Sequence, residues 1–185
     1  MARAVLTRVR LITVTLVLVV SSLAEGKSQC PADLSAGAPA DKKNQVRAFQ
    51  QALVKGPFYE ELSRRAGKPQ ACGVALDGGA IKLSYSFRGH ASLVSQVNTG
   101  GESTEQRMQA RNITAKAAMA LLKRAEKDAF GQDGCGIVWD HPAEEVAGAQ
   151  AGSREVVYRG DACNCQTRLV YEGTSIVALI VRSAC

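Results

Sequence analysis

The sequence predicts an α+β fold in which helices pack on antiparallel β-meanders and disulfides staple the chain. Segments with helical apolar spacing are followed by segments of alternating apolar and polar residues, and six cysteines lie downstream of an export-like leader. A matched phrase, Cys72-Gly73-Val74 and Cys135-Gly136-Ile137, follows a glycine-terminated helical pattern each time. The repetition suggests two similar tandem α–β halves, 41–111 and 112–185. Coincidence is the open alternative, because the β segments of the two halves align poorly.

Residues 1–24 have the three parts of a secretory signal peptide. Three arginines precede an unbroken apolar run over residues 11–20, and Ser22-Leu23-Ala24 supplies small residues for cleavage. The apolar run is shorter than the roughly 20 residues that a membrane span needs. We therefore expect an exported protein, periplasmic or extracellular, with no membrane attachment after cleavage. An N-terminal arm over residues 25–40 then precedes a disulfide-stabilised α+β domain over 41–185.

The charge pattern argues against a nucleic-acid partner. The formal net charge is +6, and removal of the three leader arginines leaves 20 basic and 17 acidic residues. No block of basic residues forms the clustered stripe that nucleic-acid binding needs. Lys123, Arg124 and Lys127 alternate with Glu126 and Asp128 on one predicted helix, which is typical of a solvated helix face with ion pairs along it.

The first half is expected to begin with two helices. Asp41 is a residue type that caps helices, and Val46, Phe49 and Leu53 follow at helical spacing. Pro57 suits the first turn of a second, shorter helix, and Gly67 suits its C-cap.

Strands are expected to follow these helices. Asp77-Gly78-Gly79 is a hairpin turn signal between a strand around 74–76 and a strictly alternating strand over 81–87. A third strand is expected around 93–97, and residues 104–111 are interpreted as a polar edge strand.

The second half repeats this order. Thr114 is expected to cap a long helix that Gly131 ends, and 142–152 is expected to be a loop or a frayed helix. A short strand over 155–158 precedes a hairpin whose last strand, 176–181, is apolar on both faces. Such a strand is expected at the centre of a sheet that is covered on both sides.

All six cysteines are predicted to form disulfides, because an exported chain with an even cysteine count is normally oxidised. The sequence does not choose among the pairings of Cys30, Cys72, Cys135, Cys163, Cys165 and Cys185. Cys163-Asn164-Cys165 carries one functional hypothesis, the third after the binding and hydrolase hypotheses given below: the pair could act as a redox dithiol or as a ligand pair for a soft metal. No second close pair of ligands accompanies it, so we predict no metal and no cofactor.

Two histidines are the candidates for acid–base chemistry. His141 lies close in sequence to Glu144 and Glu145, and His90 lies in a predicted turn. A histidine with a carboxylate suffices for nuclease-like general acid–base hydrolysis. The chain has no G-x-S-x-G, H-E-x-x-H or P-loop motif, so we favour exposed loop histidines over a secreted hydrolase.

Two short motifs have simpler structural explanations. Arg159-Gly160-Asp161 matches an adhesive triplet, and it also suits an ordinary turn. Asn112-Ile113-Thr114 is a glycosylation sequon at a helix start, where capping explains the same residues.

These observations favour an exported, non-enzymatic binding protein. We expect its partner to be another protein, such as an envelope component or a secreted enzyme that it inhibits. The sequence gives no indication of an oligomeric state.

Overall fold

The structure is a computed structural model that describes residues 30–98, 100, 103–131, 134–161 and 164–184. Within them the chain forms three α-helices, two short 3₁₀ helices and one eight-stranded antiparallel sheet, which confirms the α+β class. The helical elements are η1 (Leu34–Gly37), α1 (Lys43–Lys55), α2 (Pro57–Ala66), η2 (Arg88–His90) and α3 (Ala115–Phe130). The strands are β1 (Ala71–Asp77), β2 (Ala80–Ser86), β3 (Ser92–Asn98), β4 (Ser103–Ile113), β5 (Glu144–Ala147), β6 (Ser153–Arg159), β7 (Gln166–Glu172) and β8 (Ser175–Ala184).

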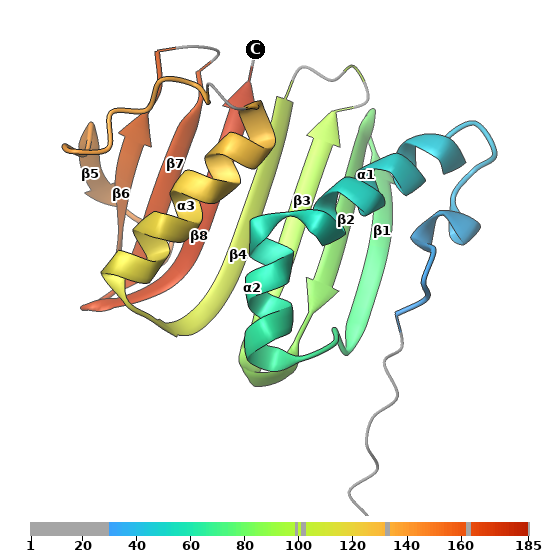
Figure 1. Cartoon of the computed structure of the whole chain (residues 1–185), viewed down its shortest axis with the longest axis horizontal. Coiled ribbons are helices and arrows are strands. Elements are labelled where there is room, and N and C mark those ends of the chain that lie inside the picture. Colours follow the sequence, from blue (N-terminus) through green and yellow to red (C-terminus); the bar gives the residue numbers. More distant parts are fainter. Residues whose placement is uncertain (1–29, 99, 101–102, 132–133, 162–163, 185) are drawn as a thin grey trace, which may run out of the picture.

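The strand order in the sheet is β1-β2-β3-β4-β8-β7-β6-β5, and every neighbouring pair is antiparallel. Successive strands are neighbours within β1–β4 and within β5–β8. The long-range pairing of β4 with β8 joins these two groups at the centre of the sheet (Figure 1). Strands β1 and β5 are the two edges.

All three α-helices cover the same face of the sheet (Figure 1). Helix α3 packs on β8 and β7, and α2 lies against β3 and α3. The main core lies between the layers and includes Phe58, Leu62 and Leu122 from the helices together with Leu93, Met108 and Leu179 from the strands. Below, the opposite face of the sheet is called the open face.

The helix ends follow local chemistry. Thr114 accepts a hydrogen bond from the Ala117 amide at 3.3 Å, as predicted for an N-cap. Pro57 begins α2, and Gly67 follows its last residue with a φ of 77°, where glycine avoids the strain of a side chain. The start predicted at Asp41 is wrong, because a turn in which Pro39 O accepts from the Lys42 amide at 2.9 Å precedes α1.

The predicted edge strand around 104–111 is also wrong. It is β4, and it lies between β3 and β8 at the centre of the sheet. Of the polar residues that indicated an edge, Glu105, Arg107 and Gln109 occupy its open face, whereas Met108 and Ala110 are buried on the helix side. The segment expected to be a loop contains the real edge strand β5, which pairs only with β6.

Strand β8 is central, as its apolar sequence predicted, but the helices that the structure describes cover only one of its faces (Figure 1). Leu179 and Val181 belong to the core under the helices. On the open face, Ala178 and Ile180 are 1% and 5% exposed and form a separate small cluster with Val170. This cluster contains no helix residue, so neighbouring strand side chains shield it.

Two disulfides are present within the described residues, Cys30–Cys72 and Cys135–Cys165. The first links the segment before η1 to β1, and the second links the loop after α3 to the start of β7. Cys163 and Cys185 lie outside the described residues. No helix among the described residues has the length and apolarity to span a membrane.

The loop that carries Cys135 is held by a buried carboxylate that was misassigned from sequence. Glu126 is 4% exposed, and its Oε1 accepts from the Cys135 amide at 2.6 Å. The prediction that Glu126 lies on a solvated helix face is therefore wrong. A Cβ at Gly134 would collide with this carboxylate, and a Cβ at Gly160 would collide with the Cys135 carbonyl. Both glycines let the chain approach this site closely.

Candidate binding face

The register of the sheet places one row of side chains across the open face of all eight strands. In order across the sheet the row is Gly73, Ser84, Val94, Arg107, Ile180, Arg168, Val157 and Glu144. We call it the central row. Alternation along a strand puts it opposite core residues such as Met108 and Leu179, which directly follow or precede row members. The row brings together residues that are more than 100 positions apart in sequence.

The part of the open face that β6, β7 and β8 form is tightly tied by charged side chains. Arg168 pairs with Glu155 at 2.9 Å and also donates to Gln166 Oε1 at 3.1 and 3.3 Å. Arg159 pairs with Glu144. The Arg168 and Glu155 side chains are only 29% and 10% exposed, because they lie among buried valines and Ile180.

Arg107 differs from these arginines. It lies at the centre of the sheet on β4, between Val94 of β3 and Ile180 of β8. Its side chain is half-buried, and it makes no ion pair or side-chain hydrogen bond with any residue that the structure describes. A planar guanidinium with apolar neighbours and free donors is suited to accept a carboxylate from outside the chain.

The β1–β3 part of the open face carries short or flexible polar side chains. Lys82 and Gln96 are exposed register partners. Ser92 donates to Gln109 of β4 at 2.8 Å, and further along the open face Glu105 of β4 faces Arg182 of β8 at 4.0 Å. Around Arg107 the open face is therefore polar and solvated toward β1–β3, whereas Ile180 on its other side is 5% exposed and already shielded.

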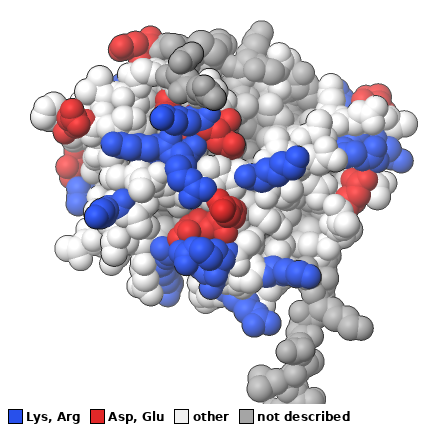
Figure 2. Space-filling view, viewed as in Figure 1, with Lys and Arg blue, Asp and Glu red and all other residues white. Residues whose placement is uncertain are grey.

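The helix side of the molecule is also rich in charge (Figure 2). The arginines of α1, α2 and α3 have acidic partners. Arg64 and Arg65 pair with Glu61 at 2.8 and 2.5 Å, and Arg124 of α3 pairs with Glu60 of α2 at 2.5 Å. The Arg64 guanidinium, followed by Arg65, lowers the pKa of Glu61. The Glu61 pairs lie within α2, and the Arg124–Glu60 pair links α3 to α2.

The structure places the two predicted histidines far apart. His90 lies in η2, before β3, and His141 precedes β5 at the opposite edge. Five strand spacings separate β3 from β5, or about 24 Å. Both histidines are exposed. Glu144 and Glu145 are each engaged by an arginine, Arg159 and Arg154 respectively.

Trp139, the aromatic residue of the same segment, packs against structural neighbours. Its ring lies 5.6 Å from that of Tyr158, and the Lys123 ammonium lies 5.5 Å from its centre. These contacts anchor the segment after Cys135 to β6 and α3.

The other sequence motifs have structural roles in the described residues. Cys165 is bonded to Cys135, and no group of three or more described Cys, His, Asp or Glu residues is arranged to hold a metal ion. Arg159 is ion-paired, and the Gly160 amide donates to Cys165 O at 2.9 Å. Asn112 is exposed with a φ of 59°, and Thr114 serves as the α3 cap.

Sequence reasoning missed both Glu126 and Arg107. The charged neighbours of Glu126 in the sequence are those of a surface residue. The polar sequence around Arg107 is typical of an edge strand, and its position becomes central only through the pairing of β4 with β8. A scan of protein-family models, a search of curated proteins and a search of solved structures each found no match to this chain.

Proposed function

We propose that this protein is an exported, non-enzymatic binding module that captures another protein on the open face of its sheet. The observation that carries this proposal is Arg107, a half-buried arginine at the centre of the open face that has no ion-pair or side-chain hydrogen-bond partner among the described residues. The two disulfides support export, because such bonds form and persist in oxidising compartments.

The size of the open face suits a protein partner. Eight strands span seven spacings, or about 34 Å, and a seven-residue strand is about 23 Å long. The product, about 800 Å², is close to what each partner buries in an interface of ordinary size.

The chemistry of the face defines the partner further. We propose that the partner presents an Asp or Glu side chain that pairs with Arg107 while apolar atoms cover the half-buried Val94. Arginine is enriched among the residues that dominate binding energy, especially when they lie centrally and are desolvated on binding. A secreted enzyme with an acidic active-site rim would be inhibited by such a contact.

We also propose that the two strand groups arose by duplication of one α–β unit. The mirrored order, with β1 and β5 as edges and β4 and β8 as the central pair, supports this proposal. In that arrangement both units contribute to the open face, and Arg107 lies where they meet.

The proposal is tested with purified wild-type protein and two arginine variants. The partner is captured from the exported fraction of the source cells on the immobilised wild type, purified, and titrated against each variant. Arg107→Ala is expected to raise Kd on the order of 30-fold, the effect of removing a central contact worth about 2 kcal/mol. The control Arg124→Ala removes an exposed arginine from the helix side and is expected to change Kd less than about twofold.

Thermal unfolding of both variants checks that the fold is retained. Equal binding by wild type and Arg107→Ala, or loss of binding in Arg124→Ala alone, would contradict the proposal.

A further inference from the structure

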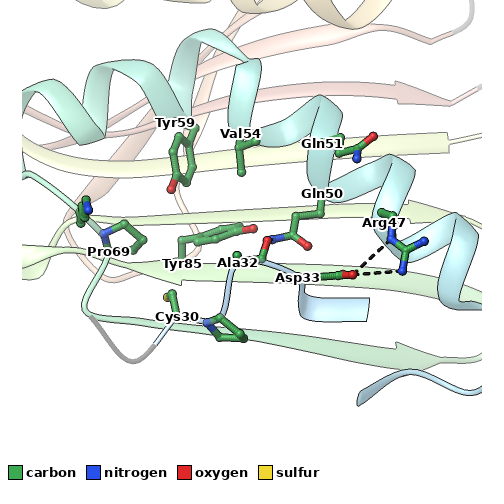
Figure 3. Close-up of a pocket in the computed structure, with 12 residues that line it drawn as sticks. Cys30, Ala32, Asp33, Arg47, Gln50, Gln51, Val54, Tyr59, Pro69 and Tyr85 are labelled. Carbon is green, nitrogen blue, oxygen red and sulfur yellow. Dashed lines mark hydrogen bonds and ion pairs between the residues drawn. The ribbon is translucent and has the colours of Figure 1, made fainter. Parts of the chain in front are cut away.

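A pocket of about 500 Å³ lies on the helix side of the sheet, away from the open face. Five segments meet there: the arm around Cys30 to Asp33, helices α1 and α2, the linker from α2 to β1, and strand β2 (Figure 3). Its volume is within the range of small-molecule sites, roughly 300–1,000 Å³. Its apolar walls come from Pro31, Val54, Tyr59, Pro69 and the Tyr85 ring.

The arm that closes the pocket is fixed in place. Cys30 is bonded to Cys72 of β1. Gln50 of α1 reaches back to the arm: its Oε1 accepts from the Leu34 amide at 2.8 Å, and its Nε2 donates to Ala32 O at 3.3 Å. The wall is therefore largely formed before any ligand arrives.

Tyr85 supplies the polar group within this pocket. The residue is 3% exposed, and its hydroxyl is buried without a hydrogen-bond partner among the described residues. Its hydroxyl points toward Gln50 (Figure 3), whose amide oxygen and nitrogen each bond to the arm and whose proximity slightly offsets the rise in the pKa of Tyr85, but the geometry between the two side chains is not that of a hydrogen bond. A buried hydroxyl without a partner is costly, and a ligand atom that accepts its proton removes that cost.

The tyrosine remains a donor at all physiological pH values. Burial, with Tyr59 nearby, raises the pKa of Tyr85 to about 12. The Tyr59 and Tyr85 rings meet edge to face, with centroids 5.2 Å apart, and Tyr59 also meets Phe87 at 5.7 Å. These contacts fix the orientation of both rings, and a planar aromatic ligand could extend the same packing.

The charge at the mouth favours an anion. Asp33 is paired with Arg47 at 3.1 Å and accepts from the Ser35 amide at 2.8 Å, so its carboxylate is occupied. Lys68 lines the pocket, is exposed, and has no acidic partner among the described residues.

We propose that this pocket binds a small aromatic carboxylate, with its ring between Tyr59 and Val54, an oxygen accepting from the Tyr85 hydroxyl, and the mouth made favourable by Lys68. The site is separate from the open face, so its failure would not affect the proposed protein binding, nor the reverse.

Phenylacetate is the probe, titrated into the full chain labelled with nitrogen-15. Binding is expected to shift backbone amides of Ala32, Gln51 and Lys68, with a Kd in the millimolar range or tighter. Phenylacetamide, which lacks the charge, is expected to bind several-fold more weakly. An absence of shifts at these amides up to about 10 mM phenylacetate would overturn the proposal, as would shifts confined to other regions.

Variants locate the donor. Tyr85→Phe removes only the hydroxyl and is expected to weaken phenylacetate binding about tenfold, the value of one hydrogen bond. Its melting temperature is expected to be equal to or above that of wild type, because the lost hydroxyl makes no hydrogen bond to any residue that the structure describes. The matched control Tyr158→Phe, a tyrosine of β6 outside the pocket, is expected to bind as wild type does. Undiminished binding by Tyr85→Phe would overturn the assignment of the donor.

Discussion

Strands β2–β3 and strands β6–β8 belong to one sheet, yet their side chains on the open face differ in exposure. On β2 the open-face residues Lys82 and Ser86 are exposed. On β6 and β8, Val157 and Ile180 are 1% and 5% exposed, although all three described α-helices lie on the other face of the sheet. Long charged side chains, chiefly Arg168 with Glu155, lie among these apolar groups and shield them with their hydrocarbon stems.

Because of this difference, the two parts of the open face have different roles: one stabilises the fold, and the other is accessible to a partner. Side chains that are buried on the open face of β6–β8 contribute to folding, so their replacement disturbs the fold. Side chains that are exposed on β2 and β3 contribute little and are free to change with a partner. Arg107 lies between these two parts of the open face. Its register neighbours are Val94 of β3 and Ile180 of β8, and it has no ion pair with a described residue.

The largest expected difference between the two parts of the open face appears when one apolar side chain on each part is shortened. Ile180→Ala is expected to lower the free energy of unfolding by about 2–4 kcal/mol, because it leaves a cavity in a buried cluster. Val94→Ala, a half-buried position in the same central row, is expected to cost less than about 1 kcal/mol. Urea unfolding of both variants measures the difference. Equal losses would show that the two parts are equally packed.

A second comparison uses one glycine from each strand group's helical region. Gly134 has a φ of 61° and lies against the Glu126 carboxylate, whereas Gly37 in η1 has open space at its Cβ position. Gly134→Ala is expected to cost about 1–3 kcal/mol, because it adds backbone strain and displaces a buried charge. Gly37→Ala is expected to stay within about 0.5 kcal/mol of wild type. Thermal or urea unfolding tests this, and a neutral Gly134→Ala would refute the close packing around Cys135.

The smallest expected effect concerns pH. Hydrogen bonding from Arg64, then Arg65, lowers the pKa of Glu61. The ionised carboxylate is therefore more stable in the folded protein than in the unfolded chain. Its contribution is therefore present above the unfolded pKa and is lost as the pH falls through the lower folded pKa. Glu61→Gln is expected to lower stability by less than about 1 kcal/mol at pH 7.

That loss should shrink as the pH falls through the lowered pKa of Glu61, where the wild-type carboxylate becomes protonated. The unfolding free energies of the two proteins, measured over a series of decreasing pH from 7 downward, give the comparison, with Glu145→Gln as the control for an exposed pair on the β5 edge. A difference between wild type and Glu61→Gln that does not change across the acidic part of the series would exclude the ion pair as its cause.

Local signals in the sequence predicted the elements whose limits depend on neighbouring residues. Pro57, Gly67 and Thr114 mark helix ends through their own backbone and hydrogen-bonding chemistry, and the Asp77-Gly78-Gly79 turn joins β1 to β2 as expected. Such features need only a few residues of context.

Features that depend on distant partners were not predictable in this way. Gln106 and Arg107 read as an edge strand until β8 is placed beside them. Glu126 reads as a surface charge until the Cys135 amide reaches it. The choice of Cys72 for Cys30 and of Cys165 for Cys135 likewise follows from the tertiary arrangement, because spacing alone permits other pairings.

The pairing of β4 with β8 also has a consequence for the order of folding. Met108 and Leu179 face each other across it although 71 positions separate them in sequence. The hairpins β1–β2, β2–β3 and β7–β8 close much shorter loops, so they are expected to form before this pair does. The central surface that carries Arg107 would then be the last part of the sheet to be completed, and a nascent chain would acquire it only after β8 has emerged.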